Sequence, residues 1–123
     1  MTSSRALALG GLVLALATAC GAFGAHALKG TLTPERLQLW ETAVRYQFIH
    51  GLGLLAVGLT PGWRERGMLA AVAGLLVAGT LLFCGSLYAL SLGAPRTLGM
   101  LTPLGGAAWL GAWLIYGVAM WRR

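Results

Sequence analysis

The feature that most constrains this chain is a series of long apolar stretches separated by short polar segments. Three stretches, at about residues 6–28, 67–92 and 98–121, are long enough to cross a bilayer as helices, which takes about 20 mostly apolar residues. The chain of 123 residues is 58% hydrophobic and only 10% charged, which is far from the composition of a soluble domain. The sequence therefore predicts an all-α fold that forms a single integral membrane domain over residues 1–123.

A fourth span is predicted over about residues 39–60, although its beginning is polar. Thr33 is a good N-cap and Pro34 suits the first helical position, so a helix is expected to begin there. It can continue unbroken until Pro61. The four spans together predict a bundle of four transmembrane helices.

Two arrangements of this second helix are open, because its first part is amphipathic with Glu41 and Arg45 on the polar side. In the arrangement that we favour, the helix enters the bilayer as a continuous rod, its polar stripe turns inward, and His50 lies within the bundle. In the alternative, residues 34–45 lie flat on the membrane and the helix bends after them. His50 would then approach His26, and the two could hold a metal ion or a lipid headgroup.

An even number of spans places both termini on the same side of the membrane. The end with the termini carries one more basic residue than the opposite end, which favours cytoplasmic termini. The basic residues of the terminal end are Arg5, Arg64, Arg66, Arg122 and Arg123, and those of the opposite end are Lys29, Arg36, Arg45 and Arg96.

The first apolar stretch has a second interpretation, as a signal peptide. Ala17-Thr18-Ala19 before Cys20 resembles a cleavage site. The apolar stretch continues past Ala19 to Leu28, however, and this favours a helix that is not cleaved.

Polar side chains gather in the half of the predicted bundle that lies away from the termini, as follows from a rise of about 1.5 Å per helical residue. Ionisable groups inside a membrane usually face a bundle interior, and the sequence predicts a polar chamber in this half, with an apolar floor. We also expect a Glu41–Arg45 ion pair, a Tyr46–His50 hydrogen bond, and Cys84 or Tyr88 beside His50. The alternative is that these groups only fasten the helices to one another. The candidate residues are His26, Glu41, Arg45, Tyr46, Gln47, His50, Cys84, Ser86 and Tyr88.

Other features carry structural expectations. Pro103 is expected to bend the last helix. The tryptophans are expected in aromatic belts at the headgroup level, and small residues spaced four apart are expected to allow close helix packing. The tryptophans are Trp40, Trp63, Trp109, Trp113 and Trp121.

Several functional classes are disfavoured. The chain has neither Asp nor Asn, so catalytic triads and metal loops built on those residues are not expected, and we predict no catalytic residue and no enzymatic activity. The two His and two Cys show no metal-binding spacing, and we expect no metal or other cofactor. The net charge of +6 comes from basic residues at segment ends rather than from a run, which argues against nucleic acid as a partner.

The leading hypothesis is a non-enzymatic membrane protein that acts as an accessory or assembly subunit, or that binds a small or lipidic molecule in its polar half. Its expected partners are the lipid bilayer and either another membrane protein or further copies of the same chain. The first alternative is a small transporter or channel, coupled to protons through His50, with Glu41 and Arg45 along the route. The second alternative is a membrane protein that binds a metal ion or haem.

Four blocks of sequence carry a family resemblance: residues 21–28 (GAFGAHAL), 42–50 (TAVRYQFIH), 84–88 (CGSLY) and 102–106 (TPLGG). With these blocks the chain resembles the YgdD/YwdK family, small bacterial inner-membrane proteins of unknown function that are similar to the eukaryotic transmembrane protein 256. The resemblance covers essentially the full length. It implies four spans, an uncleaved first helix and a place in the inner membrane, and it implies no activity.

Overall fold

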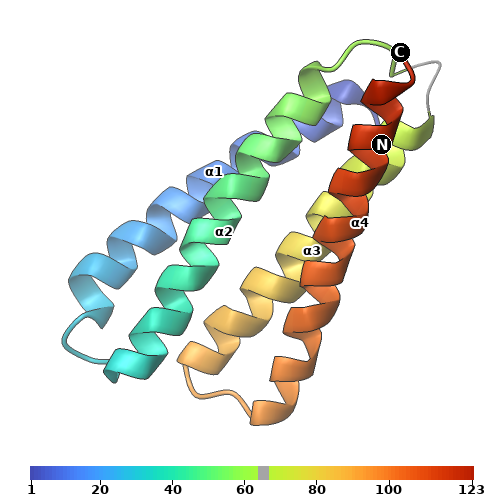
Figure 1. Ribbon diagram of the computed structural model, residues 1–123. Helices are drawn as coiled ribbons and strands as arrows, with labels where there is room; N and C mark the ends of the chain where they lie inside the picture. Colours follow the sequence, from blue (N-terminus) through green and yellow to red (C-terminus); the bar gives the residue numbers. More distant parts are fainter. Residues whose placement is uncertain (64–66) are drawn as a thin grey trace.

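The computed structural model describes residues 1–63 and 67–123, and the protein is helical along most of this length (Figure 1). No strand occurs in these two ranges. The elements are α1 (Ser3–Phe23) with a π-helical continuation η1 (Gly24–Leu28), α2 (Pro34–Leu59), α3 (Gly67–Ser91), a short 3₁₀ helix η2 (Arg96–Met100), and α4 (Leu101–Trp121).

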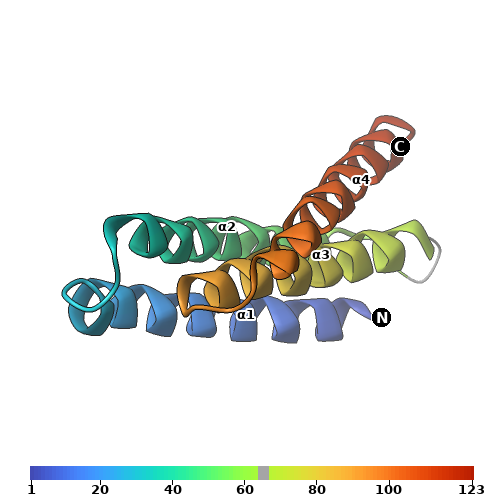
Figure 2. The same cartoon turned by 90° about the horizontal axis from the view of Figure 1, so that it is seen from below.

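The helices run up and down, so that both termini lie at the same end as the α2–α3 connection (Figure 1). The α1–α2 and α3–α4 connections lie together at the opposite end, which we call the loop end. Helix α2 packs against α1 and α3, and α4 packs against α3. Figure 2 shows that α4 is inclined to the other three helices. Both termini lie at one end of the bundle, as an even number of spans requires, while two of the basic residues counted for that end, Arg64 and Arg66, lie outside the described residues.

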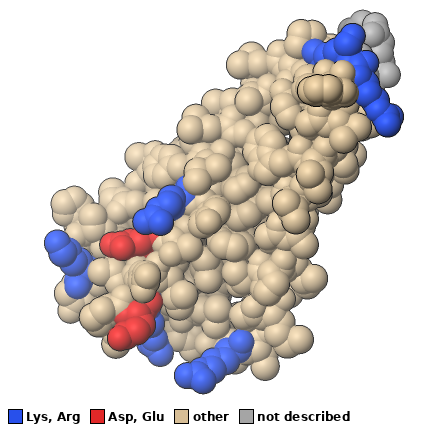
Figure 3. Space-filling view, viewed as in Figure 1, with Lys and Arg blue, Asp and Glu red and all other residues tan. Residues whose placement is uncertain are grey.

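Three helical segments of the described chain are long and apolar enough to cross a membrane: Ser3–Leu28, Gly67–Ser91 and Arg96–Trp121. Their bounds agree with the predicted spans to within a few residues. Helix α2, which contains the predicted fourth span, is as long, with 26 residues or about 39 Å, but it is less apolar and is not one of these three segments. It lies alongside α1 and α3. Lys and Arg side chains gather at both ends of the molecule, and much of the surface between them is uncharged (Figure 3).

Helix α2 is one continuous α-helix from Pro34 to Leu59, so the predicted rod is confirmed and the alternative with a bend is wrong. The Thr33 hydroxyl caps its beginning by accepting a hydrogen bond from the Arg36 backbone N–H. The indole Nε1 of Trp40 donates to the Cys20 carbonyl at 2.8 Å, which ties this first part of α2 to α1. Capping and this contact hold residues 34–45 in line with the rest of the helix.

Two glycines allow α3 and α4 to approach closely. A Cβ atom on Gly79 would lie 2.4 Å from Cδ1 of Trp109, and one on Gly105 would lie 2.5 Å from the backbone nitrogen of Phe83. Both distances are far below a van der Waals contact. Small residues therefore do permit tight packing at this interface, but these two glycines are not part of the predicted four-residue spacings, and a Cβ on Gly74, Gly85 or Gly111, which are, would meet nothing within 4 Å.

Two expectations about α4 and the tryptophans are wrong. Pro103 lies in the first turn of α4, where a missing backbone N–H costs no intrahelical hydrogen bond, and it does not bend the helix interior. Trp40 and Trp109 are only 6% and 4% exposed, so they belong to the core and not to an aromatic belt. Trp121, which is 92% exposed at the end of α4, fits the belt expectation.

Candidate functional site

Gln47 stands at the centre of the predicted polar half and joins three helices. Gln47 is on α2 and only 5% exposed, and its side-chain Nε2 donates a hydrogen bond to the Val13 carbonyl of α1 at 3.1 Å. The Tyr88 hydroxyl of α3 donates to Gln47 Oε1 at 2.5 Å. A buried amide that satisfies its oxygen and one of its donors across two interfaces fixes the positions of α1 and α3 against α2.

Cys84 and Ser86 make further contacts between helices. The Cys84 thiol donates to the Ala43 carbonyl of α2 at 3.3 Å, and the Ser86 hydroxyl lies 2.5 Å from the Thr102 hydroxyl of α4. In the described parts of the chain, no buried side-chain nitrogen or oxygen lacks a hydrogen-bond partner. Cys84, Ser86, Gln47 and Tyr88 thus form hydrogen bonds that join neighbouring helices. This agrees with the alternative in which the polar groups fasten the helices, rather than with a polar chamber.

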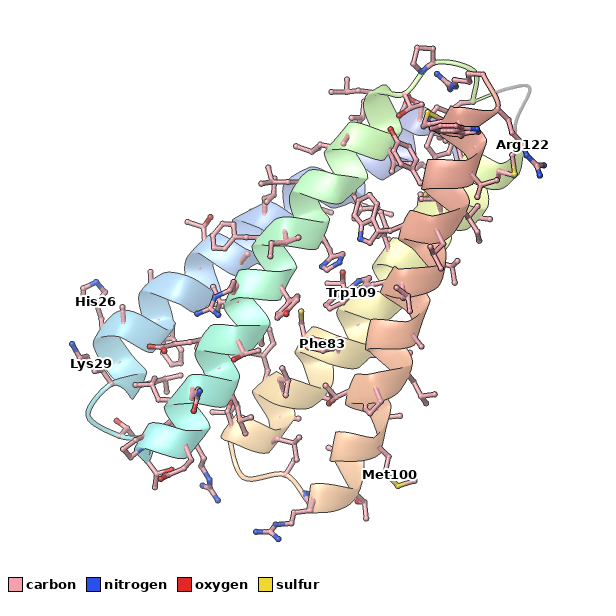
Figure 4. All side chains as sticks on the ribbon, viewed as in Figure 1. His26, Lys29, Phe83, Met100, Trp109 and Arg122 are labelled. Atoms are coloured by element: carbon pink, nitrogen blue, oxygen red, sulfur yellow. The ribbon has the colours of Figure 1, made fainter. Side chains whose placement is uncertain are left out.

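His50 lies three residues after Gln47 on α2 and stacks on an aromatic ring of α4. Its imidazole lies parallel to the Trp109 indole, with ring centroids 3.6 Å apart and planes inclined by 4°. Figure 4 shows Trp109 between α2 and α4. The expectation that His50 is buried is confirmed, at 4% exposure, but its ring neighbours are Trp109, Tyr46 and Trp113, rather than Cys84 or Tyr88. The reason is that the close approach of α4 to α3 carries Trp109 inward.

The predicted Tyr46–His50 hydrogen bond exists in another form. His50 Nδ1 lies 2.8 Å from the backbone carbonyl of Tyr46 rather than from its hydroxyl. Because a carbonyl oxygen only accepts, Nδ1 carries the proton in this contact, and a neutral ring has its lone pair on Nε2. The Tyr46 side chain is 38% exposed and packs against Phe83 and Trp109.

Glu41 and Arg45 do not turn into the bundle, and this part of the prediction is wrong. Both side chains are exposed, while Trp40, Gln47 and His50 take the inward face of α2. The burial of the large Trp40 indole sets the rotation of the helix and leaves the charged stripe outside. The expected ion pair is not formed either, since within the described residues no oppositely charged atoms approach to 4.0 Å.

The two charged side chains border a groove between α1 and α2 that we call the α1–α2 groove. It has a volume of about 210 Å³. Arg45 lies about 16 Å along the helix from Pro34 and about 21 Å from Leu59, close to the middle of α2. Gly21, Gly24, Ala25, Trp40, Glu41, Val44 and Arg45 line the groove.

The remaining candidates are separated from one another. His26 is exposed on the π-helical turn near the loop end (Figure 4), whereas His50 is buried against Trp109 of α4. Glu41 and Arg45 lie on the α1 side of α2, whereas His50 contacts α4, so the three residues of the transporter hypothesis do not line one path. Across residues 1–63 and 67–123, no group of three His, Cys, Asp or Glu side chains is placed to share a metal ion.

Sequence reasoning missed Trp109 and the glycines that admit it. A depth estimate could have found Trp109, because it lies eight residues, or about 12 Å, after the beginning of α4 and is therefore well inside that helix. The sequence did not single out Gly79 and Gly105 as the point of contact between α3 and α4, because both helices contain several other glycines.

Comparison with known proteins agrees with the membrane fold. Residues 20–106 match the family described as "Protein of unknown function (DUF423)". The chain is 43% identical to the UPF0382 membrane protein SERP0230 of Staphylococcus epidermidis over 90% of each chain. It is 42% identical to the UPF0382 membrane protein YwdK of Bacillus subtilis over 90% of this chain and 91% of the relative. No solved structure matches the chain. The protein is therefore a membrane protein that belongs to the DUF423 family of unknown function.

Proposed function

We propose that the protein is a non-enzymatic accessory subunit that docks onto another membrane protein through the α1–α2 groove. The observation that carries this proposal is the exposure of Arg45 near the middle of α2 and of Glu41 one turn nearer its beginning. An arginine at the centre of a lipid-facing helix costs about 2.5–3.5 kcal/mol on insertion scales. A surface that keeps two such groups is better suited to contact with protein than with acyl chains.

The charges of this surface are available to a partner. Neither Glu41 nor Arg45 has an ion-pair partner among the described residues. A facing helix with one base and one acid a turn apart would pair with both, and both pairs would be strong because water is excluded from such an interface and the local dielectric is low.

The shape of the groove supports the same conclusion. Gly21, Gly24 and Ala25 supply no bulky side chain on the α1 side, and Val44 of α2 lies next to them. Helix association in membranes depends on such small residues, because they let two backbones come close. The Trp40 indole forms one wall and is held by its hydrogen bond to Cys20.

The interior of the bundle supports a non-enzymatic role. Within the candidate set, the buried side chains of Gln47, Cys84 and Ser86 and the half-buried side chain of Tyr88 are each engaged in a contact between helices. Such a core holds a docking surface rigid. We further propose that the protein resides in a bacterial inner membrane with both termini in the cytoplasm, as the basic residues of the terminal end favour.

Photo-crosslinking in the native membrane tests the docking surface. A photoreactive residue at Val44 should give one discrete protein adduct, and the same residue at Leu114, which is 62% exposed on α4, should give lipid adducts. The reversal Arg45→Glu should reduce the Val44 adduct at least about tenfold, whereas Arg45→Lys should preserve most of it.

Three results would contradict the proposal. Lipid adducts alone at Val44 would favour lipid binding in the groove. A protein adduct unaffected by Arg45→Glu would show that the charges play no part. Proton flux into proteoliposomes that disappears in His50→Ala would favour the transporter.

A further inference from the structure

A second hollow lies at the loop end, on the other side of α2 from the α1–α2 groove. It has a volume of about 470 Å³, within the range of small-molecule sites. Its lining consists of two arginines over an apolar floor: Arg36 at the start of α2, Arg96 at the start of η2, and Leu39, Leu90 and Ala94. We call it the two-arginine hollow.

The turn between α3 and η2 brings the two arginines to one site. Gly93 has a φ of +101°, a backbone conformation that favours glycine, and this sharp turn places η2 beside the start of α2. The Nη1 atom of Arg36 lies 3.7 Å from the position that a Cβ on Gly93 would take. The guanidinium of α2 therefore extends over the turn that leads to Arg96.

Both guanidinium groups are exposed and unpaired. Neither forms an ion pair or a side-chain hydrogen bond with another described residue, although Glu35 is the immediate neighbour of Arg36 in the chain. Two like charges on the rim of one hollow attract an anion, and the guanidinium fork matches the oxygens of a phosphate.

The position of the hollow along the helices favours a lipid headgroup as the source of such an anion. Helix α2 is about 39 Å long and the hydrocarbon core is about 30 Å thick, so roughly three residues at each end of a centred helix lie at the headgroup level. Arg36 is the third residue of α2. Leu39, one turn further along α2 than Arg36, and Leu90, in the last turn of α3, form the apolar part of the same hollow, against which the first part of an acyl chain can lie.

We infer that the two-arginine hollow binds an anionic phospholipid, with its phosphodiester between Arg36 and Arg96 and the upper part of an acyl chain against Leu39 and Leu90. Phosphatidylglycerol carries this chemistry. The site is independent of the α1–α2 groove and of any protein partner, because it uses neither Glu41 nor Arg45.

Native mass spectrometry of the full-length protein, titrated with phosphatidylglycerol in a non-ionic detergent, measures the proposed binding. A basic residue at a membrane surface contributes about fivefold to the attraction of anionic lipid, so Arg36→Gln and Arg96→Gln should each lower the affinity about fivefold or more. The matched control is Lys29→Gln, which removes an exposed cation at the same end but outside the hollow. It should leave the affinity within about twofold. Far-ultraviolet circular dichroism should show unchanged helix content in all three variants, because none of the side chains has a hydrogen bond to lose.

Several outcomes would overturn the inference. An equal loss in Lys29→Gln would indicate general attraction to a basic surface. Equal affinity for phosphatidylcholine, which has the phosphate but no net charge, would show that anionic lipid is not selected. Displacement of the lipid by millimolar inorganic phosphate would make free phosphate the ligand. If a variant loses helix content, Leu90→Trp, which fills the floor and keeps both charges, replaces it and should also lower the affinity.

Discussion

Replacing Tyr88 with Phe removes one hydroxyl from a hydrogen bond that joins α3 to α2. The bond ends on Gln47, which is 5% exposed, so water does not easily replace the lost donor. Tyr88→Phe leaves Gln47 Oε1 without its donor, and Gln47→Leu leaves the Tyr88 hydroxyl without its acceptor. The double variant leaves neither group unpaired, and its cost should be smaller than the sum of the two single costs.

The expected coupling follows from values for membrane proteins. Hydrogen bonds between transmembrane helices average about 0.6 kcal/mol in double-mutant cycles, with a maximum of about 1.7 kcal/mol. The Tyr88–Gln47 bond is short, at 2.5 Å, and largely shielded, and we expect a coupling of about 1–1.7 kcal/mol. Gln47→Leu alone should cost more than Tyr88→Phe alone, because it also removes the bond to the Val13 carbonyl.

The measurement is reversible unfolding of the wild type, both single variants and the double variant in bicelles, with steric trapping as the readout. Thr18→Ala is the control, because the Thr18 hydroxyl is exposed and bonds only to the Leu14 carbonyl of its own helix. It should show no coupling to Tyr88→Phe. If the Gln47 and Tyr88 variants are additive within about 0.3 kcal/mol, the bond does not fasten the helices and the reasoning fails.

Three further predictions concern packing and topology. Gly105→Ala places a Cβ 2.5 Å from the Phe83 backbone and should destabilise the α3–α4 pair by about 1–3 kcal/mol, whereas Gly111→Ala, with nothing within 4 Å, should be neutral or stabilising in the same unfolding assay. His50→Phe keeps an aromatic ring stacked on Trp109, so its free energy of unfolding should exceed that of His50→Ala by about 0.5–1.5 kcal/mol. Its tryptophan fluorescence should also differ less from that of the wild type. Equal losses of stability in the two variants would show that stacking does not matter. A reporter that is active only in the cytoplasm should be active when fused to either terminus, and a reporter that is active only outside the cytoplasm should be inactive at both. Opposite results for the two termini would contradict an even number of spans.

The lengths and ends of the helices could be predicted from the sequence because they depend on local features. Apolar length sets the spans, and the cap at Thr33 with Pro34 sets the start of α2. The burial of His50 also followed from its depth and position. These properties do not require knowledge of which helices are neighbours.

The rotation of each helix could not be predicted in the same way. Depth along α2 gave no reason to choose between burying Glu41 with Arg45 and burying Trp40 with Gln47. The choice depends on the partners that α1 and α3 offer, such as the Cys20 carbonyl for Trp40 and the Tyr88 hydroxyl for Gln47. Contacts of this kind exist only once the helices are placed side by side.

The environment of the α1–α2 groove tests the central claim most directly. A spin label at Val44, with Cys20 and Cys84 replaced by Ser and Arg45 intact, reports by power saturation whether its surroundings admit oxygen, a water-soluble nickel chelate or neither. In native membrane vesicles we predict low accessibility to both relaxants at Val44, as expected for contact with protein, and high oxygen accessibility at Leu114 of α4. High oxygen accessibility at Val44 would mean that acyl chains cover the groove, high nickel accessibility would mean that water fills it, and either result would contradict a docked partner.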